Sequence, residues 1–349
     1  MTVISAGIDI GSLTTEIFIL ENEKPKGKIC FSSAKLLDNL KKVEKKLKEF
    51  KVDLTICAFG YGLPVKKLSD LTDFEVFLAT LNLEDEIFGI RKFIEYFRKK
   101  EMEIYTIPGV IHLPTVPVSR KINKIDMGTP DKVASVALAM YEQLSELEVK
   151  KQNFILVESG YGFNSFIGVK NGKIVDGLGG TSGFISFLSP GCIDGEVAYL
   201  LQGFKKNLLF NSGFMNFLGE KISDIGKLPS KVINWICEYL LKGIKVMEVS
   251  TNTNKVLVSG RLFKNYKIFK RLRDASKKFG YEIKKLKGFG LSKQSAEGAA
   301  IIANGLAGGS FKKIVDSLKI KKASGTCIDY LTPSFRHLII AKVKDHLKN

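Results

Sequence analysis

Two stretches of the chain, about 150 residues apart, share one pattern of apolar and polar positions. Residues 3–20 combine an apolar strand, a glycine turn and a second strand rich in Ile, Phe and Thr. Residues 154–169 repeat this arrangement, and Asn171-Gly172 then predicts a hairpin turn into a further strand at 173–177. A pattern that recurs in this way predicts an internal duplication of one structural unit.

Apolar residues recur at helical spacing between these strands. Thr129, Pro130 and Asp131 form a helix-start signal, with a capping residue, proline at the first helical position and an early acid. Because strands alternate with helices, the pattern predicts an α/β architecture. The predicted helices span 36–50, 85–100, 132–147, 194–209, 212–217, 230–248 and 264–279, the further strands 54–59 and 255–259, and extended chain 103–111 and 116–118.

The polar run at 148–153 separates the two copies of the pattern. A length of 349 residues suits two domains, each able to bury a core. We therefore expect a first lobe at residues 1–150, a second lobe at 151–310 and a C-terminal helical tail at 311–349 that packs on a lobe.

The chain is strongly basic, with 54 Lys and Arg against 36 Asp and Glu and a formal net charge of +18. Of the basic residues 47 are Lys and 7 are Arg. Surfaces that read nucleic acid favour clustered Arg, whereas Lys interleaved with Glu is typical of thermophilic proteins. We therefore expect a thermophilic surface, and nucleic acid is not expected as the main partner.

Five cysteines occur singly, and with three histidines they form no zinc-binding spacing, so we expect reduced thiols. No apolar run reaches the roughly 20 residues that cross a bilayer, and the first residues lack a signal-peptide pattern. We expect a cytoplasmic protein without a membrane partner.

The first glycine turn, Gly7 to Thr15, has the residue types of a phosphate and magnesium site. Asp9 ends an apolar strand, and we expect it to hold Mg²⁺ through water. The candidates to contact phosphate oxygens are Gly11 through its backbone and Ser12, Thr14 and Thr15 through their hydroxyls. A plain hairpin with Asp9 as a turn residue is the alternative.

The second turn repeats this order of residue types. Glu158 again places a carboxylate at the end of a strand, and Gly160, Gly162 and Asn164 follow it. Two such turns, one from each lobe, would face each other across a cleft and hold the phosphates from both sides. We therefore expect Asp9 and Glu158 to be the catalytic pair.

Two further segments are candidates for binding a nucleotide. The strand at 255–259 breaks at Gly260-Arg261, a turn that suits an adenosine or its phosphates, although a routine strand-to-helix connection explains it equally well. Gly298 lies in a helix of small residues, 292–305, which packing alone would also explain.

Candidates for an acceptor site surround the helix start at Gly128-Thr129-Pro130, whose N-terminus favours anions. Asp131 is equally explained as a helix-start acid. The candidate residues are Arg120, Asp126, Asp131 and Lys132.

Taken in order, the turns at Asp9 and Glu158, the break at Gly260 and the helix at Gly298 resemble the motifs of the acetate and sugar kinase, Hsp70 and actin (ASKHA) superfamily. The resemblance covers most of residues 3–309. It implies two ribonuclease-H-like lobes, an actin-like ATPase fold, with ATP and Mg²⁺ in the cleft between them. The first lobe would add acceptor-site elements and the second would bind the nucleotide.

Within that superfamily, segments 172–191 and 296–305 look like those of butyrate kinases, and the whole chain resembles an archaeal family described as predicted butyrate kinases. This resemblance implies transfer of the γ-phosphoryl group of ATP to a small-molecule acceptor such as a short-chain carboxylate. Those kinases usually carry Asn at the position of Asp9, and a histidine in the loop that here reads Glu158-Ser-Gly-Tyr-Gly. A carboxylate acceptor needs no base, whereas an alcohol acceptor would require Glu158 or another acidic residue as its base.

Residues 7–15 and Gly60-Tyr-Gly62 are also similar to the ATPases that activate 2-hydroxyacyl-CoA dehydratases. Those activators hold an iron–sulfur cluster through cysteines, but segment 177–183 has no cysteine here, so no cluster is expected. An activator or regulatory ATPase that acts on a protein partner is therefore the alternative function, and a nucleotide-binding protein with degraded chemistry is a third. The oligomeric state is left open, with a homodimer as one option.

Overall fold

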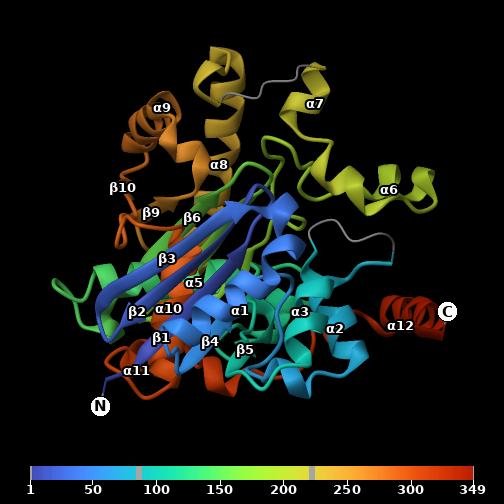
Figure 1. Cartoon of the computed structure of the whole chain (residues 1–349). Helices are drawn as coiled ribbons and strands as arrows, with labels where there is room; N and C mark the ends of the chain where they lie inside the picture. The colour runs from blue at the N-terminus through green and yellow to red at the C-terminus, as the bar shows by residue number, and fades with distance from the viewer. Residues whose placement is uncertain (1, 84–88, 220–224, 349) are drawn as a thin grey trace.

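The computed structural model describes residues 2–83, 89–219 and 225–348, and its strands form two five-stranded sheets (Figure 1). In the first sheet the order is β3-β2-β1-β4-β5. β1, β2 and β3 form an antiparallel meander, whereas β4 runs parallel to β1 and β5 parallel to β4. Its strands are β1 (Ile4–Ile10), β2 (Thr14–Glu21), β3 (Lys24–Ser32), β4 (Leu54–Cys57) and β5 (Ile104–Thr106).

The second sheet has the order β10-β9-β6-β7-β8. β6, β7 and β8 again form an antiparallel meander, and β9 and β10 run parallel to β6 on its other side. The two sheets thus have the same topology, which confirms the predicted duplication and the α/β fold class. The strands of the second sheet are β6 (Phe154–Ser159), β7 (Asn164–Lys170), β8 (Lys173–Leu178), β9 (Lys255–Ser259) and β10 (Glu282–Lys285).

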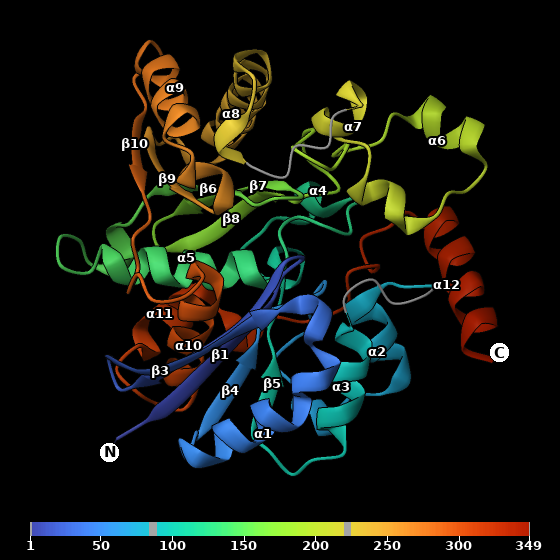
Figure 2. The same ribbon diagram turned by 45° about the horizontal axis from the view of Figure 1, so that its top comes forward.

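Helices cover both sheets (Figure 2). Along α8, a row of apolar side chains is buried against the second sheet. The helices are α1 (Leu40–Glu49), α2 (Asp73–Thr80), α3 (Ile90–Arg98), α4 (Val118–Lys121), α5 (Pro130–Glu142), α6 (Gly195–Leu201), α7 (Phe214–Leu218), α8 (Ser230–Thr251), α9 (Tyr266–Lys277), α10 (Gln294–Leu306), α11 (Lys312–Leu318) and α12 (Pro333–Lys348). None of the described helices combines the length and apolar character that a membrane span requires.

Two helices of small residues join the halves of the molecule. α10 packs on β1, β2 and β4, while α5 packs on β6 and β7, and the two helices pack against each other. Glycine permits this close approach, because a Cβ on Gly7 would overlap the backbone of α10 and one on Gly298 would overlap the carbonyl oxygen of Ala134 in α5. The ends of β1 and β6 therefore lie on either side of one helix pair.

The sequence pattern missed β3, β10 and α2. β3 carries exposed Lys with Pro25 and Gly27, and β10 buries one side chain, Ile283, so neither shows a clear apolar alternation. α2 has apolar residues on most of its surface, and its start is marked by a capping box between Thr72 and Glu75.

Some predicted boundaries were also wrong. Residue Val118, expected in extended chain, begins α4, and the helix expected at 194–209 ends at Leu201. The helix expected at 132–147 ends at Glu142, although it starts with Pro130 at its first position as predicted. For the helix expected at 85–100, residues 85–88 lie outside the described residues, and α3 covers 90–98.

The C-terminal helix α12 reaches back to the first lobe, where it lies beside α2 (Figure 2). Its residues Ile339 and Ile340 pack against the main apolar core, and the ring of His346 lies 5.9 Å from that of Phe77 in α2. The C-terminal helix therefore lies on the same side of the molecule as α6 (Figure 2).

Candidate active site

A cavity of about 620 Å³ opens between the two lobes. The ends of β1 and β6, the start of α5, the turn after β9 and the segment before α10 all contribute to its wall. Most of the predicted site residues line it: Asp9, Gly11, Ser12, Thr14, Asp126, Asp131, Lys132, Glu158, Gly160, Gly162, Gly260 and Arg261. The fold thus brings both glycine turns and three of the four predicted acceptor residues to one space.

Asp9 forms an ion pair with Lys293, which directly precedes α10. Lys293 Nζ lies 3.0 Å from Asp9 Oδ2 and also donates to the carbonyl oxygen of Thr14. Burial raises the pKa of Asp9 and Lys293 opposes that shift, while the neighbouring charge of Asp131 raises the pKa further. The ammonium of Lys293 thus neutralises the carboxylate at the end of β1.

The turn after Asp9 is closed by a backbone hydrogen bond from Gly11 N to Thr14 O, 3.1 Å long. Ser12, at the tip, is exposed. Glu16 ties this turn to the segment before α10, because its Oε2 accepts from Ser292 Oγ at 2.8 Å and from the backbone N of Lys293 at 2.9 Å. The turn and Lys293 therefore form one connected wall of the cavity.

The opposite wall carries a second pair of lysine and carboxylate. Lys132 Nζ lies 2.9 Å from Glu158 Oε1 and also pairs with Asp131. Glu158 Oε2 accepts from Ser135 Oγ at 2.8 Å and from Ser259 Oγ at 3.4 Å. This network joins the start of α5 to the ends of β6 and β9.

Charges within this network shift its pKa values. Burial raises the pKa of Glu158, while Lys132 acts in the opposite direction. Burial by itself would lower the pKa of Lys132, but Asp131 and Glu158 outweigh it and raise that pKa. Lys132 therefore remains a cation at physiological pH, enclosed beside two carboxylates.

Asp126 positions the segment before α5. Its Oδ1 accepts from the backbone N of Gly128 at 3.0 Å, and its Oδ2 accepts from the backbone N and the hydroxyl of Thr181 at 3.1 and 3.2 Å. These bonds attach the start of α5 to the loop after β8, so this acceptor candidate also shapes the wall that it lines.

Four predicted site residues lie outside the lining of the cavity. Thr15 turns inward, where its hydroxyl meets Ser33 Oγ at 3.0 Å, and Gly298 lies in the contact between α5 and α10. Asn164 Oδ1 accepts from Ser159 Oγ at 2.6 Å, which braces the second turn from behind. Arg120 donates to Val175 O at 2.7 Å and lies 3.6 Å from Asp176. Their roles toward a ligand stay predictions.

Sequence reasoning missed several residues that line the cavity. Lys293 is one of 47 lysines, and no local pattern distinguishes it from the others. Lys206 follows α6, and its Nζ donates to Thr80 O at 2.8 Å and Leu81 O at 3.0 Å. Burial lowers the pKa of Lys206 to about 8. Tyr61, whose ring lies 5.2 Å from that Nζ, also lines the cavity, and its only signal in the sequence was the Gly60-Tyr-Gly62 segment.

The donor set is compatible with magnesium that arrives with a nucleotide. Within residues 2–83, 89–219 and 225–348, no three or more His, Cys, Asp or Glu side chains form a group that would hold a metal ion. Mg²⁺ usually keeps several waters and binds one or two carboxylates together with phosphate oxygens. Asp9, which is buried at the cavity wall and paired with Lys293, is suited to be such a carboxylate ligand.

Solved structures of two acetate kinases support the fold. The acetate kinase from Entamoeba histolytica superimposes with a TM-score of 0.57 at 13% identity, over 79% of this chain and 87% of that one. The acetate kinase from Porphyromonas gingivalis gives 0.55 at 12% identity, over 85% and 98%. The (R)-2-hydroxyglutaryl-CoA dehydratase component A from Acidaminococcus fermentans gives 0.43 at 15% identity, over 90% and 99%.

The acetate kinase matches confirm the expected α/β fold of two ribonuclease-H-like lobes. The likeness to butyrate kinases stays a prediction. No curated protein matches the sequence significantly. One family model matches residues 7–333, nearly the whole chain, and the protein therefore belongs to the family described as "Protein of unknown function (DUF1464)".

Proposed function

We propose that the protein is an ATP-dependent phosphotransferase that transfers the γ-phosphoryl group to a small-molecule acceptor, with a short-chain carboxylate as the first candidate. One observation carries the proposal: two pairs of lysine and carboxylate, Lys293 with Asp9 and Lys132 with Glu158, line one cavity from its two sides. The likeness of the fold to acetate kinase supports it, since the cavity lies between two lobes of that architecture.

Phosphoryl transfer depends on positioning and on the neutralisation of phosphate charge. Magnesium, when bound with ATP, would neutralise phosphate oxygens, and Asp9 would hold it through water. Lys132 supplies a fixed cation on the other wall, since Asp131 and Glu158 keep it charged and oriented. Ser12, exposed at the tip of the first turn, is placed to donate to a phosphate oxygen.

Two acceptor classes place different demands on Glu158. A carboxylate is already a nucleophile, so Glu158 would only orient Lys132. An alcohol must lose a proton, and the raised pKa of Glu158 makes it a better base near neutral pH than an ordinary glutamate. Because the chain has no histidine in this turn, Glu158 is the candidate base for an alcohol.

A second candidate function is an ATPase that acts on a protein partner, and the surface of α6 favours it. This helix buries none of its residues, and Tyr199 and Leu200 are each 75% exposed. Exposed apolar side chains next to each other are typical of protein contacts. Turnover would then depend on a partner protein.

The deciding experiment measures ADP release from Mg-ATP at elevated temperature by the wild type and by Asp9→Ala. Each is assayed alone and with short-chain carboxylates, sugars and polyols. Release that depends on one acceptor class and is lost in the variant supports the phosphotransferase. If the wild type binds ATP but no compound stimulates release, the phosphotransferase is contradicted. Release that then depends on a partner protein would distinguish a partner-dependent ATPase from a nucleotide-binding protein without turnover.

A further inference from the structure

A basic surface lies at the outer edge of the second lobe. Residues 264–287 contain ten Lys or Arg side chains and two acids, Asp274 and Glu282. They belong to α9, to the edge strand β10 and to the residues that flank these elements. The ten basic residues, here named the α9–β10 surface, are Lys264, Lys267, Lys270, Arg271, Arg273, Lys277, Lys278, Lys284, Lys285 and Lys287.

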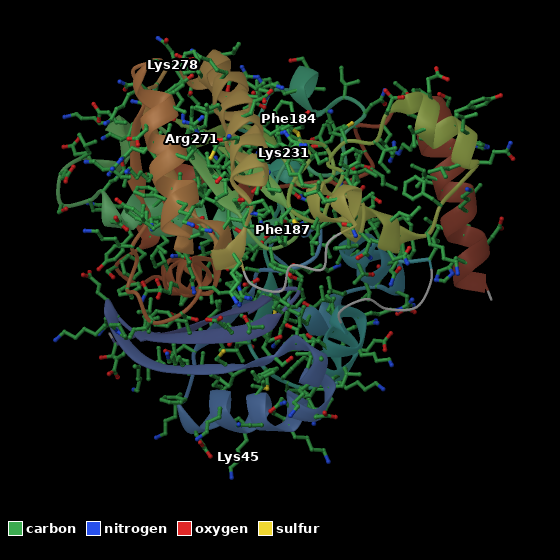
Figure 3. All side chains as sticks on the ribbon, turned by 90° about the horizontal axis from the view of Figure 1, so that it is seen from above. Lys45, Phe184, Phe187, Lys231, Arg271 and Lys278 are labelled. Carbon is green, nitrogen blue, oxygen red and sulfur yellow. The ribbon has the colours of Figure 1, made fainter. Side chains whose placement is uncertain are left out.

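These side chains face solvent. All are exposed except Arg273, which is half-buried. Arg271 and Lys278 lie at the α9 edge of the second lobe, whereas Lys45 of α1 lies at the opposite end of the molecule (Figure 3). Lys264, at one end of the surface, also lines the cavity of the candidate active site.

The charge of this surface is not compensated by acids. Among the described residues, one of the ten, Lys277, has an ion-pair partner, Asp274 at 3.5 Å, and Arg271 donates to the neutral amide oxygen of Asn234. Five lysines on the neighbouring α8 and on α1 differ, because a glutamate one turn away pairs with each of them. Those pairs are Lys242–Glu238, Lys245–Glu248, Lys45–Glu49, Lys46–Glu49 and Lys48–Glu44.

Aromatic rings are interleaved with these cations. Phe269 lies beneath Arg273, whose Cζ is 5.6 Å from the ring centre, and beneath Lys285, whose Nζ is 4.6 Å away. Tyr266 and Phe279 are 64% and 43% exposed, so parts of both rings are accessible. Cations along a phosphate backbone together with exposed rings are the two elements that bind single strands without sequence preference.

We propose that the α9–β10 surface binds single-stranded nucleic acid, its lysines contacting phosphates and the rings of Tyr266 and Phe279 stacking on bases. A duplex offers these rings no unstacked base, so a single strand fits better. An acidic protein would satisfy the cations but has no bases for the rings to stack on. The lysine-rich composition of the whole chain does not single out this surface, whereas its missing acid partners do.

The test is fluorescence anisotropy with labelled DNA and RNA single strands of about 20 nucleotides and a duplex of the same length, over a range of KCl concentrations. The surface variant combines Lys267→Gln, Lys270→Gln, Lys278→Gln and Lys285→Gln. The control combines Lys41→Gln, Lys42→Gln, Lys45→Gln and Lys48→Gln on α1, and removes the same charge. Thermal melting checks that both variants fold. If the surface variant does not fold, the single substitutions Lys270→Gln and Tyr266→Ala are measured in its place.

We expect the surface variant to bind single strands at least about tenfold more weakly and the control to stay within about twofold of the wild type. The slope of log K against log salt should shrink by about 0.7 for each phosphate that the variant no longer neutralises. Tyr266→Ala should weaken binding without changing that slope. The DNA and RNA arms show which strand is preferred. Absence of wild-type binding, an equal loss in the control, or a preference for duplex would overturn the proposal.

Discussion

Lys293 Nζ lies 3.0 Å from Asp9 Oδ2, so the end of the first strand and the segment that leads into α10 meet at one ion pair. Both side chains line the same cavity. Lys293 also donates to Thr14 O, which lies at the far side of the first glycine turn. The lysine therefore sets the charge of the turn and fixes its shape.

Removing this lysine should weaken nucleotide binding. In Lys293→Ala the turn loses the cation at the phosphate side of the cavity, and Asp9 loses its ion-pair partner. We expect the dissociation constant for ATP to rise about tenfold to a hundredfold, the usual size of a lost charge-assisted hydrogen bond. Calorimetric titration measures it.

The matched control is Lys28→Ala, since Lys28 contacts Leu291 O at 3.0 Å near the same segment but does not line the cavity. Its affinity for ATP should equal that of the wild type. Equal affinities in wild type and Lys293→Ala would show that Lys293 plays no part in binding.

Lys132 and Glu158 should be energetically coupled. Their side chains are 16% and 14% exposed, so Lys132→Met leaves a buried carboxylate without its cation. We expect this substitution to lower the free energy of unfolding by about 3 kcal/mol. Adding Glu158→Gln should restore part of the loss, because the amide carries no charge.

Urea unfolding of the two single variants and the double variant completes the cycle. A coupling energy above about 0.5 kcal/mol is expected for groups in direct contact. Additive losses would contradict the coupling. Lys45→Met with Glu49→Gln, an exposed pair at 3.8 Å, is the matched control and should show almost none.

His112 should make stability depend on pH. It is 1% exposed, its Nε2 has no hydrogen-bond partner among the described residues, and burial lowers its pKa from 6.5 to about 4. As pH falls through 6.5, the imidazole of the unfolded chain takes up a proton while the folded one stays neutral. The folded state therefore loses stability between pH 6.5 and 4, by about 3 kcal/mol from this residue.

Urea unfolding at pH 7 and pH 4 measures this effect. In His112→Gln, whose side chain does not titrate, the free energy of unfolding should fall less between pH 7 and pH 4, by the contribution given above for His112. An identical pH dependence in wild type and variant would show that His112 is not buried in its neutral form.

Gly298→Ala should force α5 and α10 apart. The added Cβ would overlap the carbonyl oxygen of Ala134, and backbone atoms cannot yield as a flexible side chain can. We expect a loss of about 1–3 kcal/mol in the free energy of unfolding. Gly195→Ala is the control, since a Cβ there meets no atom within 4 Å. A neutral Gly298→Ala would contradict the close contact.

Sequence patterns could predict much of this fold because the duplicated meander repeats its own local signals. Apolar alternation, the Asn171-Gly172 turn and the start of α5 at Pro130 are encoded by neighbouring residues. The boundaries at 150 and 310 stay predictions. These boundaries depend on contacts between segments that are distant in the sequence, such as the packing of α10 on the first sheet.

The sequence by itself determined that two glycine turns with strand-end carboxylates, Asp9 and Glu158, occur at equivalent places in two similar lobes, because local composition and spacing record that repetition. Tertiary structure alone decided which cations neutralise them. Lys293 comes from the segment before α10 and Lys132 from the start of α5, and chain folding brings each to its carboxylate across a long sequence separation. Tertiary structure also turned Thr15 and Asn164 away from the cavity. Alternate residues of a strand face opposite sides of the sheet, so the hydroxyl of Thr15 contacts Ser33. Asn164 accepts a hydrogen bond from Ser159 within its own hairpin.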